Sequence, residues 1–172
     1  IALVDYNKRT VKFLNENYSK KTKDNELILK EKLSEKVGLL KVHPNIDPKL
    51  FKFFTENYKA FVIEGTGLGH APTNMGVNLK NFELLKNFIK NGGIVAMTSQ
   101  CLYGAVHPYV YTNLRKLSEI GCLFCEDMLP ETAFIKLSWL MGNYPVEKVK
   151  ELMVENLRGE INTKRTYEKE FI

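Results

Sequence analysis

A glycine-rich segment, Glu64–Asn74, contains the first residues whose types could do chemistry. Its sequence EGTGLGHAPTN has glycines at positions 65, 67 and 69, which let a backbone approach a ligand closely or adopt positive φ. His70 supplies its one reactive side chain, an imidazole. The segment lacks the GKS or GKT ending of a phosphate loop and the GxGxxG pattern, so it resembles a nucleotide site only superficially.

A second segment, Ser99–Asn113, combines Cys101, His107 and three tyrosines. A cysteine and a histidine could act as a thiol nucleophile and its base. The alternative is that Cys101 packs as a small hydrophobic side chain, as a cysteine directly after a buried strand usually does. We favour packing, because the sequence around Cys101 and His107 does not indicate a fold known to use such a pair.

A third segment places Glu126, Asp127 and Glu131 within six residues of one another. Such carboxylates could hold a hard cation or act in acid–base catalysis, or they could cap the following helix and interact with its dipole. We favour capping. Cys122 and Cys125 form a single CxxC, which does not supply the four ligands of a structural zinc site.

Continuous apolar runs alternate with helical patterns and indicate the elements that position these segments. The expected strands are 37–42, 60–65, 94–99 and 123–124. Asp47 and Pro48 predict a helix start, and Gly92, Gly121 and Gly142 predict helix ends. His43 is expected in a turn before Pro44, and Leu137, Trp139 and Leu140 in the core. This order predicts an α/β, flavodoxin-like three-layer domain with a four-stranded parallel sheet over residues 27–157. Ligands of such sheets bind beyond the carboxyl ends of the strands, where all three segments lie.

Flanking segments complete the expected organisation. Residues 1–14 predict a short β-hairpin that ends a preceding domain, residues 15–26 a polar linker, and residues 158–172 a tail. The abrupt start on a strand suggests a piece of a longer polypeptide.

Composition narrows the function classes. The 172 residues are 44% apolar and 26% charged, which excludes global disorder and a disulfide scaffold. No apolar run approaches the ~18–20 residues of a membrane-spanning helix. Three cysteines, an odd number, favour a reducing cytoplasm. The net charge of +5 is densest near Lys20, Lys21 and Lys23, a cluster that could contact RNA but is more typical of a solvated linker.

Four segments together carry a more specific signal: GTGLGHAPTN, GGIVAMTSQCLYGAVHPYVY, CEDMLPETAFIKLSWLMG and NLRGEI. They resemble the C-terminal part of the type I L-asparaginase family, and within it the archaeal glutamyl-tRNA(Gln) amidotransferase D subunits. The resemblance covers essentially the whole chain. It implies a large N-terminal domain followed by a flavodoxin-like C-terminal domain, and the second of these agrees with the strand and helix pattern.

The resemblance also implies an activity. In this family a threonine attacks the side-chain amide of glutamine or asparagine, aided by a second threonine, an aspartate and a lysine. The ammonia passes to the amidotransferase E subunit, which uses ATP and Mg²⁺ to amidate glutamate on tRNA(Gln). These catalytic residues lie in the N-terminal domain, and the chain has no TGGTI-like or TDT motif. We therefore expect no catalysis, cofactor or metal in this chain alone.

The family resemblance points to a homodimer in which a loop of this domain reaches the neighbour's active site. His70, after Gly69, stands at the position that is usually asparagine. Its imidazole could bind a substrate carboxylate or ammonium, or it could only fix the loop. Two departures from the pattern limit the resemblance: Ala105 replaces the usual arginine after CLYG, and Tyr111 replaces an acidic residue of periplasmic relatives.

Three alternatives stay open. The chain could belong to a free-standing asparaginase. It could be an amino-acid-sensing module that uses His70 with a ligand loop of Thr98, Ser99 and Gln100. A tRNA-binding module would depend on the lysine cluster alone, and we rank it last.

Overall fold

The computed structural model describes residues 2–14 and 28–162 of the chain. The chain divides into two units, Ile1–Lys30 and Glu31–Ile172, and each is described by itself. The expected linker 15–26, with Lys20, Lys21 and Lys23, lies outside the described residues, so the predictions made for it stay predictions.

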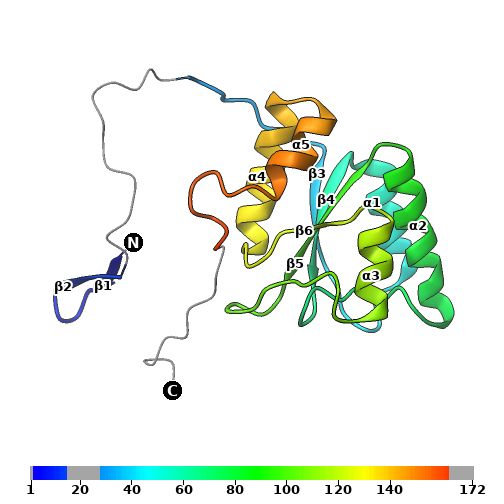
Figure 1. Cartoon of the computed structure of the whole chain (residues 1–172), viewed down its shortest axis with the longest axis horizontal. Helices are drawn as coiled ribbons and strands as arrows, with labels where there is room; N and C mark the ends of the chain where they lie inside the picture. The colour runs from blue at the N-terminus through cyan, green and yellow to red at the C-terminus, as the bar shows by residue number, and fades with distance from the viewer. Residues whose placement is uncertain (1, 15–27, 163–172) are drawn as a thin grey trace. The chain divides into compact units, whose positions relative to one another are not determined.

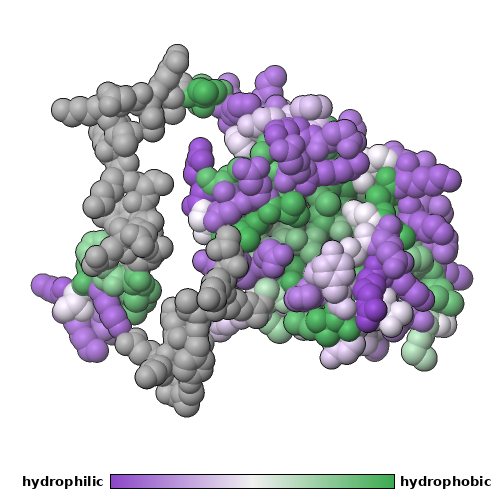
Figure 2. Space-filling view, in the orientation of Figure 1, coloured by the Kyte–Doolittle hydropathy of each residue, from purple (hydrophilic) through white to green (hydrophobic). Residues whose placement is uncertain are grey.

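The N-terminal unit contains the expected hairpin. Strand β1 (Ala2–Asp5) pairs antiparallel with β2 (Thr10–Phe13), and Ala2 lies opposite Phe13. The Asp5 carboxylate accepts a hydrogen bond from the Lys8 backbone N–H in the turn, at 3.0 Å. The apolar side chains of both strands are exposed and form much of the hairpin's surface (Figure 2). Because a lone two-stranded hairpin is marginally stable in water, these strands need further polypeptide to cover them.

A four-stranded parallel sheet forms the centre of the second unit (Figure 1). Its strands are β3 (Val37–Lys41), β4 (Ala60–Gly65), β5 (Ile94–Ser99) and β6 (Leu123–Phe124), paired in that order. Val37 lies opposite Ala60, and Ala60 lies opposite Ile94. The order follows the chain, so the described sheet lacks the reversal in strand order at which many open parallel sheets form their ligand crevice.

Helices cover both faces of this sheet. Helices α1 (Pro48–Asn57), α2 (Leu79–Lys90) and α3 (Thr112–Glu119) connect neighbouring strands and lie on one face, with the short 3₁₀ helix η1 (Gly76–Asn78) before α2 (Figure 1). Right-handed crossovers that progress in one direction place all three connecting helices on the same side. Helices α4 (Pro130–Asn143) and α5 (Val146–Met153) cover the other face. The predicted three-layer fold is confirmed, and no helix of the described residues is long and apolar enough to cross a membrane.

The two faces have separate apolar cores. Phe51, Phe61, Leu85, Leu114 and Leu117 are fully buried on the α1–α3 side. On the α4–α5 side the fully buried residues include Leu137, Leu140, Val149 and Met153. The core prediction is therefore confirmed for Leu137 and Leu140. Trp139 is only partly buried and lines an apolar groove of about 820 Å³ along α4.

The predicted helix start at Asp47 is confirmed, and of the three predicted helix ends two are confirmed and one is wrong. Asp47 caps α1, and its carboxylate accepts from the Lys49 N–H at 2.8 Å. Gly92 (φ +90°) and Gly121 (φ +98°) each follow the C-cap residue. Gly142 does not end α4, which continues to Asn143. A Cβ at position 142 would lie 2.5 Å from the Lys32 carbonyl oxygen, so glycine is needed there for close packing.

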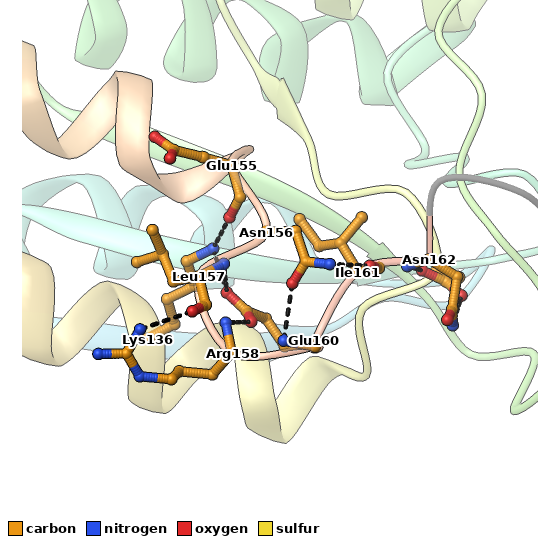
Figure 3. A network of polar contacts seen from close by, with 10 residues as sticks. Lys136, Glu155, Asn156, Leu157, Arg158, Glu160, Ile161 and Asn162 are labelled. Carbon is orange, nitrogen blue, oxygen red and sulfur yellow. Dashed lines mark hydrogen bonds and ion pairs between the residues drawn. The ribbon is translucent and has the colours of Figure 1, made fainter. Parts of the chain in front are cut away.

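The chain after α5 folds back onto α4 (Figure 3). The ammonium group of Lys136 lies 2.7 Å from the Glu160 carboxylate and also donates to the Glu155 carbonyl. Ile161 is buried in the α4–α5 core. Packed structure thus continues through residue 162, beyond the limit expected at 157, and the remaining residues of the expected tail lie outside the described part of the chain.

Candidate functional site

The loops after β4 and β5 meet at the carboxyl edge of the sheet, as the parallel topology requires. The Gln100 N–H donates to the Gly65 carbonyl at 2.7 Å, and the His107 N–H donates to the Leu68 carbonyl at 3.0 Å. These backbone hydrogen bonds make the glycine-rich segment and the 99–113 segment one surface.

The glycine-rich segment forms a tight turn that presents His70. Thr66 and His70 exchange backbone hydrogen bonds of 2.9 and 2.8 Å. Gly67 and Gly69 adopt positive φ inside the turn. A Cβ on Gly69 would lie 2.7 Å from Val106 Cγ1, so both the backbone conformation and the packing require glycine.

The His70 imidazole is half-buried and makes no hydrogen bond to any residue that the structure describes. Its ring contacts the ring of Tyr111, with centroids 5.1 Å apart. Burial lowers the pKa of His70 below its usual value, which favours the neutral imidazole. A neutral imidazole carries one N–H donor and one acceptor nitrogen. His70 itself lines a pocket of about 270 Å³, together with His43, Thr66, Asn74, Asn78 and Asn113.

Buried polar side chains hold the segment that follows His70. The Thr73 hydroxyl donates to Asn113 Oδ1 at 2.8 Å, and Asn113 Nδ2 donates to the Ala71 carbonyl at 3.0 Å. Asn81 Nδ2 donates to the Pro72 carbonyl at 2.9 Å. Sequence reasoning missed these residues. A signal was present, because each asparagine stands four residues before a fully buried leucine and therefore faces the core.

Thr98, Ser99 and Gln100 cross-link the loops through their side chains. The Thr98 hydroxyl donates to the Ile63 carbonyl at 3.1 Å, and the Ser99 hydroxyl donates to the Gly67 carbonyl at 2.5 Å. Gln100 Nε2 donates to the carbonyls of Val42 and Glu64. These donors are engaged with the backbone, and a ligand-binding role for this loop stays a prediction.

Cys101 and His107 neither pack in the core nor form a catalytic pair. Cys101 is exposed, so the prediction that it packs as a small hydrophobic side chain is wrong. Its backbone N–H donates to the Ser99 hydroxyl. His107 Nδ1 accepts from the Tyr109 N–H at 3.3 Å, which gives this imidazole a role in the turn. Among the described residues, no hydrogen bond joins the thiol and the imidazole as a catalytic pair would require.

The acidic segment before α4 has a different role from the one favoured above. The N-cap of α4 is Leu129, and no side chain caps the helix, so the capping prediction is wrong for Glu126 and Asp127. Asp127 instead accepts from the backbone and side-chain N–H groups of Asn162, at 2.9 and 2.5 Å. Glu131 lies in the first turn, where a carboxylate favours the helix dipole. In the described residues no group of three His, Cys, Asp or Glu side chains could hold a metal ion.

The two cysteines of the CxxC lie on different sides of the sheet. Cys122 is buried in the α1–α3 core and Cys125 in the α4–α5 core. Burial raises the pKa of both thiols to about 12. Both are therefore packed, protonated thiols. His43 is exposed, and its carbonyl accepts from the Ile46 N–H in the expected turn.

A parallel three-layer domain with this carboxyl-edge loop defines a class of protein. Residues 36–153 match the glutaminase/asparaginase C-terminal domain, and the chain belongs to this family. Among its relatives is the D subunit of the glutamyl-tRNA(Gln) amidotransferase of Methanococcus maripaludis strain C6, which is 45% identical over 164 residues. That match covers 94% of this chain and 38% of the relative. The corresponding D subunit of Pyrococcus abyssi is 42% identical, over 88% of this chain and 33% of that protein.

Solved structures share the fold. The thermostable L-asparaginase from Thermococcus kodakarensis superposes with a TM-score of 0.77 and 27% identity, over 95% of this chain and 48% of that one. L-asparaginase I from Vibrio cholerae gives a TM-score of 0.71 and 28% identity, over 81% of this chain and 41% of that one. The chain thus spans less than two fifths of the curated relatives described above and less than half of these structures.

Proposed function

We propose that this domain is the C-terminal part of a glutamyl-tRNA(Gln) amidotransferase D subunit, which releases ammonia from glutamine or asparagine. The support is the identity of 45% to a D subunit over nearly the whole chain, against 27% to a free-standing asparaginase. The domain's own part is dimerisation and completion of the neighbouring active site. The threonine nucleophile belongs to the N-terminal domain, so this chain alone is inactive.

The main observation behind this proposal is the position of His70 at the end of the glycine turn. A glycine turn closed by two backbone hydrogen bonds holds the backbone of His70, and the neutral imidazole that burial favours has a donor and an acceptor nitrogen unengaged by the described residues. Such a group can donate to a substrate carboxylate or accept from a substrate ammonium. Placed across a dimer interface, His70 would bind the amino-acid end of the substrate while the neighbour's threonine attacks the amide.

Exposed apolar side chains around the same edge support a homodimer. Leu102, Tyr103, Tyr109 and Val110 of one loop are exposed, as is Met75 beyond the glycine turn. Apolar surface is visible along the lower edge of the domain, where these loops lie (Figure 2). A second copy that covers this surface would remove it from water and bring His70 to the partner.

The remaining steps belong to other parts of the assembly. Ammonia would pass to the E subunit, which would use ATP and Mg²⁺ to amidate glutamate on tRNA(Gln) in the cytoplasm. The tRNA would be bound through the complex, and no cofactor is assigned to this chain.

Complementation between two variants tests the cross-interface role directly. One complete D subunit carries the nucleophilic threonine changed to alanine, and the other carries His70→Ala. If His70 serves the neighbour's site, the mixed dimer gains one site with both groups intact and regains a low KM for the amide substrate. A mixed dimer no better than the His70→Ala homodimer contradicts the proposal.

A second candidate is the same domain in a free-standing L-asparaginase, which the similarity to two solved L-asparaginases favours. Transamidation of Glu-tRNA(Gln) by the complete protein together with the E subunit separates the two. An amino-acid-sensing role predicts binding of asparagine, aspartate or glutamine to this chain alone, which calorimetry measures.

A further inference from the structure

The ring of Tyr111 is the aromatic neighbour of the His70 imidazole. The two ring centroids lie 5.1 Å apart and the planes are inclined by 53°. We infer that Tyr111 is a positioning residue, whose ring holds the His70 imidazole in the orientation that its ligand requires. This inference rests on the proposed function of His70.

Both rings are attached to backbones that cannot move independently. His70 closes the turn with Thr66, and Tyr111 is the N-cap residue of α3, with its carbonyl accepting from the Arg115 N–H at 3.0 Å. The buried Asn113, two residues into α3, is hydrogen-bonded to Thr73 and to the Ala71 carbonyl, directly after His70. The distance between the two Cα positions is therefore fixed by buried hydrogen bonds, and the ring contact is built into the fold.

The imidazole has no hydrogen bond from the described residues to fix its direction, so its orientation depends on packing, to which the ring of Tyr111 contributes. No described residue makes a hydrogen bond to its ring nitrogens, and these two atoms must keep their direction to bind a ligand. An aromatic face limits rotation about the side-chain bonds without competing for the nitrogens. Tyr111 is 54% exposed, so its remaining surface faces outward at the same edge as His70. The contact thus preorganises His70 and lowers the entropy lost when the ligand binds.

Four variants of the complete D subunit test the inference. Tyr111→Ala removes the ring, Tyr111→Phe keeps the ring without its hydroxyl, and His70→Ala removes the imidazole. Phe53→Ala is the matched control, because Phe53 is an exposed aromatic residue of α1 whose ring contacts Phe54 and Tyr58 rather than His70. Tyr111→Ala should raise KM for the amide substrate by about threefold to tenfold, which is the effect expected from the loss of one aromatic pair. The change in kcat should be much smaller. Tyr111→Phe and Phe53→Ala should stay within about twofold of the wild-type KM.

Several results would overturn the inference, and they separate it from the proposed function. If His70→Ala raises KM and Tyr111→Ala does not, the positioning role is wrong and the proposed function stands. If His70→Ala leaves KM unchanged, the proposed function fails and the inference fails with it. Tyr111→Phe behaving like Tyr111→Ala would assign the effect to the hydroxyl and contradict positioning by the ring. An equal effect of Tyr111→Ala in a His70→Ala background would show that Tyr111 acts without His70.

A second measurement needs no activity and uses this chain itself. The ring of Tyr111 should shift the imidazole C–H resonances of His70 in the NMR spectrum. Tyr111→Ala should move these resonances, while Tyr111→Phe and Phe53→Ala should leave them close to their original positions. Unchanged His70 resonances in Tyr111→Ala would contradict the contact.

Discussion

The carboxylate of Glu160 lies 2.7 Å from the ammonium group of Lys136, and the two side chains are only 11% and 6% exposed. The pair joins the middle of α4 to the loop that follows α5 (Figure 3). Glu160 also accepts hydrogen bonds from the backbone N–H groups of Leu157 and Arg158, at 3.0 and 2.6 Å. One carboxylate thus holds the last described loop against the body of the domain.

Breaking this pair should destabilise the domain strongly. Lys136→Met leaves the Glu160 carboxylate buried without its cation, and the loss of one partner of a buried ion pair costs about 3–5 kcal/mol. Urea denaturation measures the free energy of unfolding. Lys148→Met, which removes an exposed partner of Glu151, is the control and should change the free energy of unfolding far less, because solvent screens an exposed ion pair. Equal effects of the two substitutions would contradict a special role for the buried pair.

Stability should depend on pH through Glu160. Burial alone would raise its pKa, but the Lys136 hydrogen bond and the backbone N–H groups outweigh burial and lower the pKa to about 2. Because the folded-state pKa is lower than the unfolded value of about 4.3, the carboxylate stabilises the fold above pH ~4.3 and loses this effect as pH falls toward 2. The difference in unfolding free energy between the wild type and Glu160→Gln should therefore shrink across this interval. A difference that is constant from pH 6 to pH 3 would contradict the assignment.

Gly142→Ala should destabilise the domain although alanine favours helices. At a helix position with free space around it, the change from glycine to alanine would stabilise the fold by about 0.5–1 kcal/mol. Here the new Cβ would meet the Lys32 backbone at 2.5 Å, and overpacking of this kind costs about 1–3 kcal/mol. Thermal unfolding followed by circular dichroism decides between the two signs, and a higher melting temperature would rule out the steric account.

Asn113→Ala should loosen the loop that presents His70. The substitution removes the two buried hydrogen bonds of Asn113, each of which contributes about 0.5–1.5 kcal/mol. The hydrogen bond from the Thr73 hydroxyl to the Ala71 carbonyl, at 3.2 Å, remains. Amide hydrogen exchange should become faster in residues 66–74. Asn87→Ala, on the exposed face of α2, is the matched control and should leave both exchange and stability nearly unchanged. Unaltered exchange in Asn113→Ala would show that Asn113 does not hold this loop.

The chain by itself should release no ammonia from glutamine or asparagine. The proposed function places the nucleophilic threonine in the N-terminal domain, whereas residues 36–153 of this chain match the C-terminal domain of the family. The assay uses chain purified from a host without asparaginase or glutaminase. Ammonia formation above the buffer background would show that a nucleophile exists within these 172 residues.

Local pattern determined the elements and their order. The four strands, the cap at Asp47 and the glycine turn before His70 could be predicted because each depends on apolar periodicity or on the backbone preference of single residues. Parallel pairing then followed, since helices separate the strands. The carboxyl-edge location of the candidate site followed from the pairing.

Tertiary structure decided the pairings between distant residues. The use of Asp127 to hold Asn162, the close approach of Lys32 to Gly142 and the contact of Tyr111 with His70 depend on how loops and helices meet in space. Acidic residues before a helix are equally suited to capping or to a distant partner, so residue type alone could not choose. Which partner a polar side chain takes is settled by burial, because a buried donor or acceptor must find whatever group the packing brings within reach.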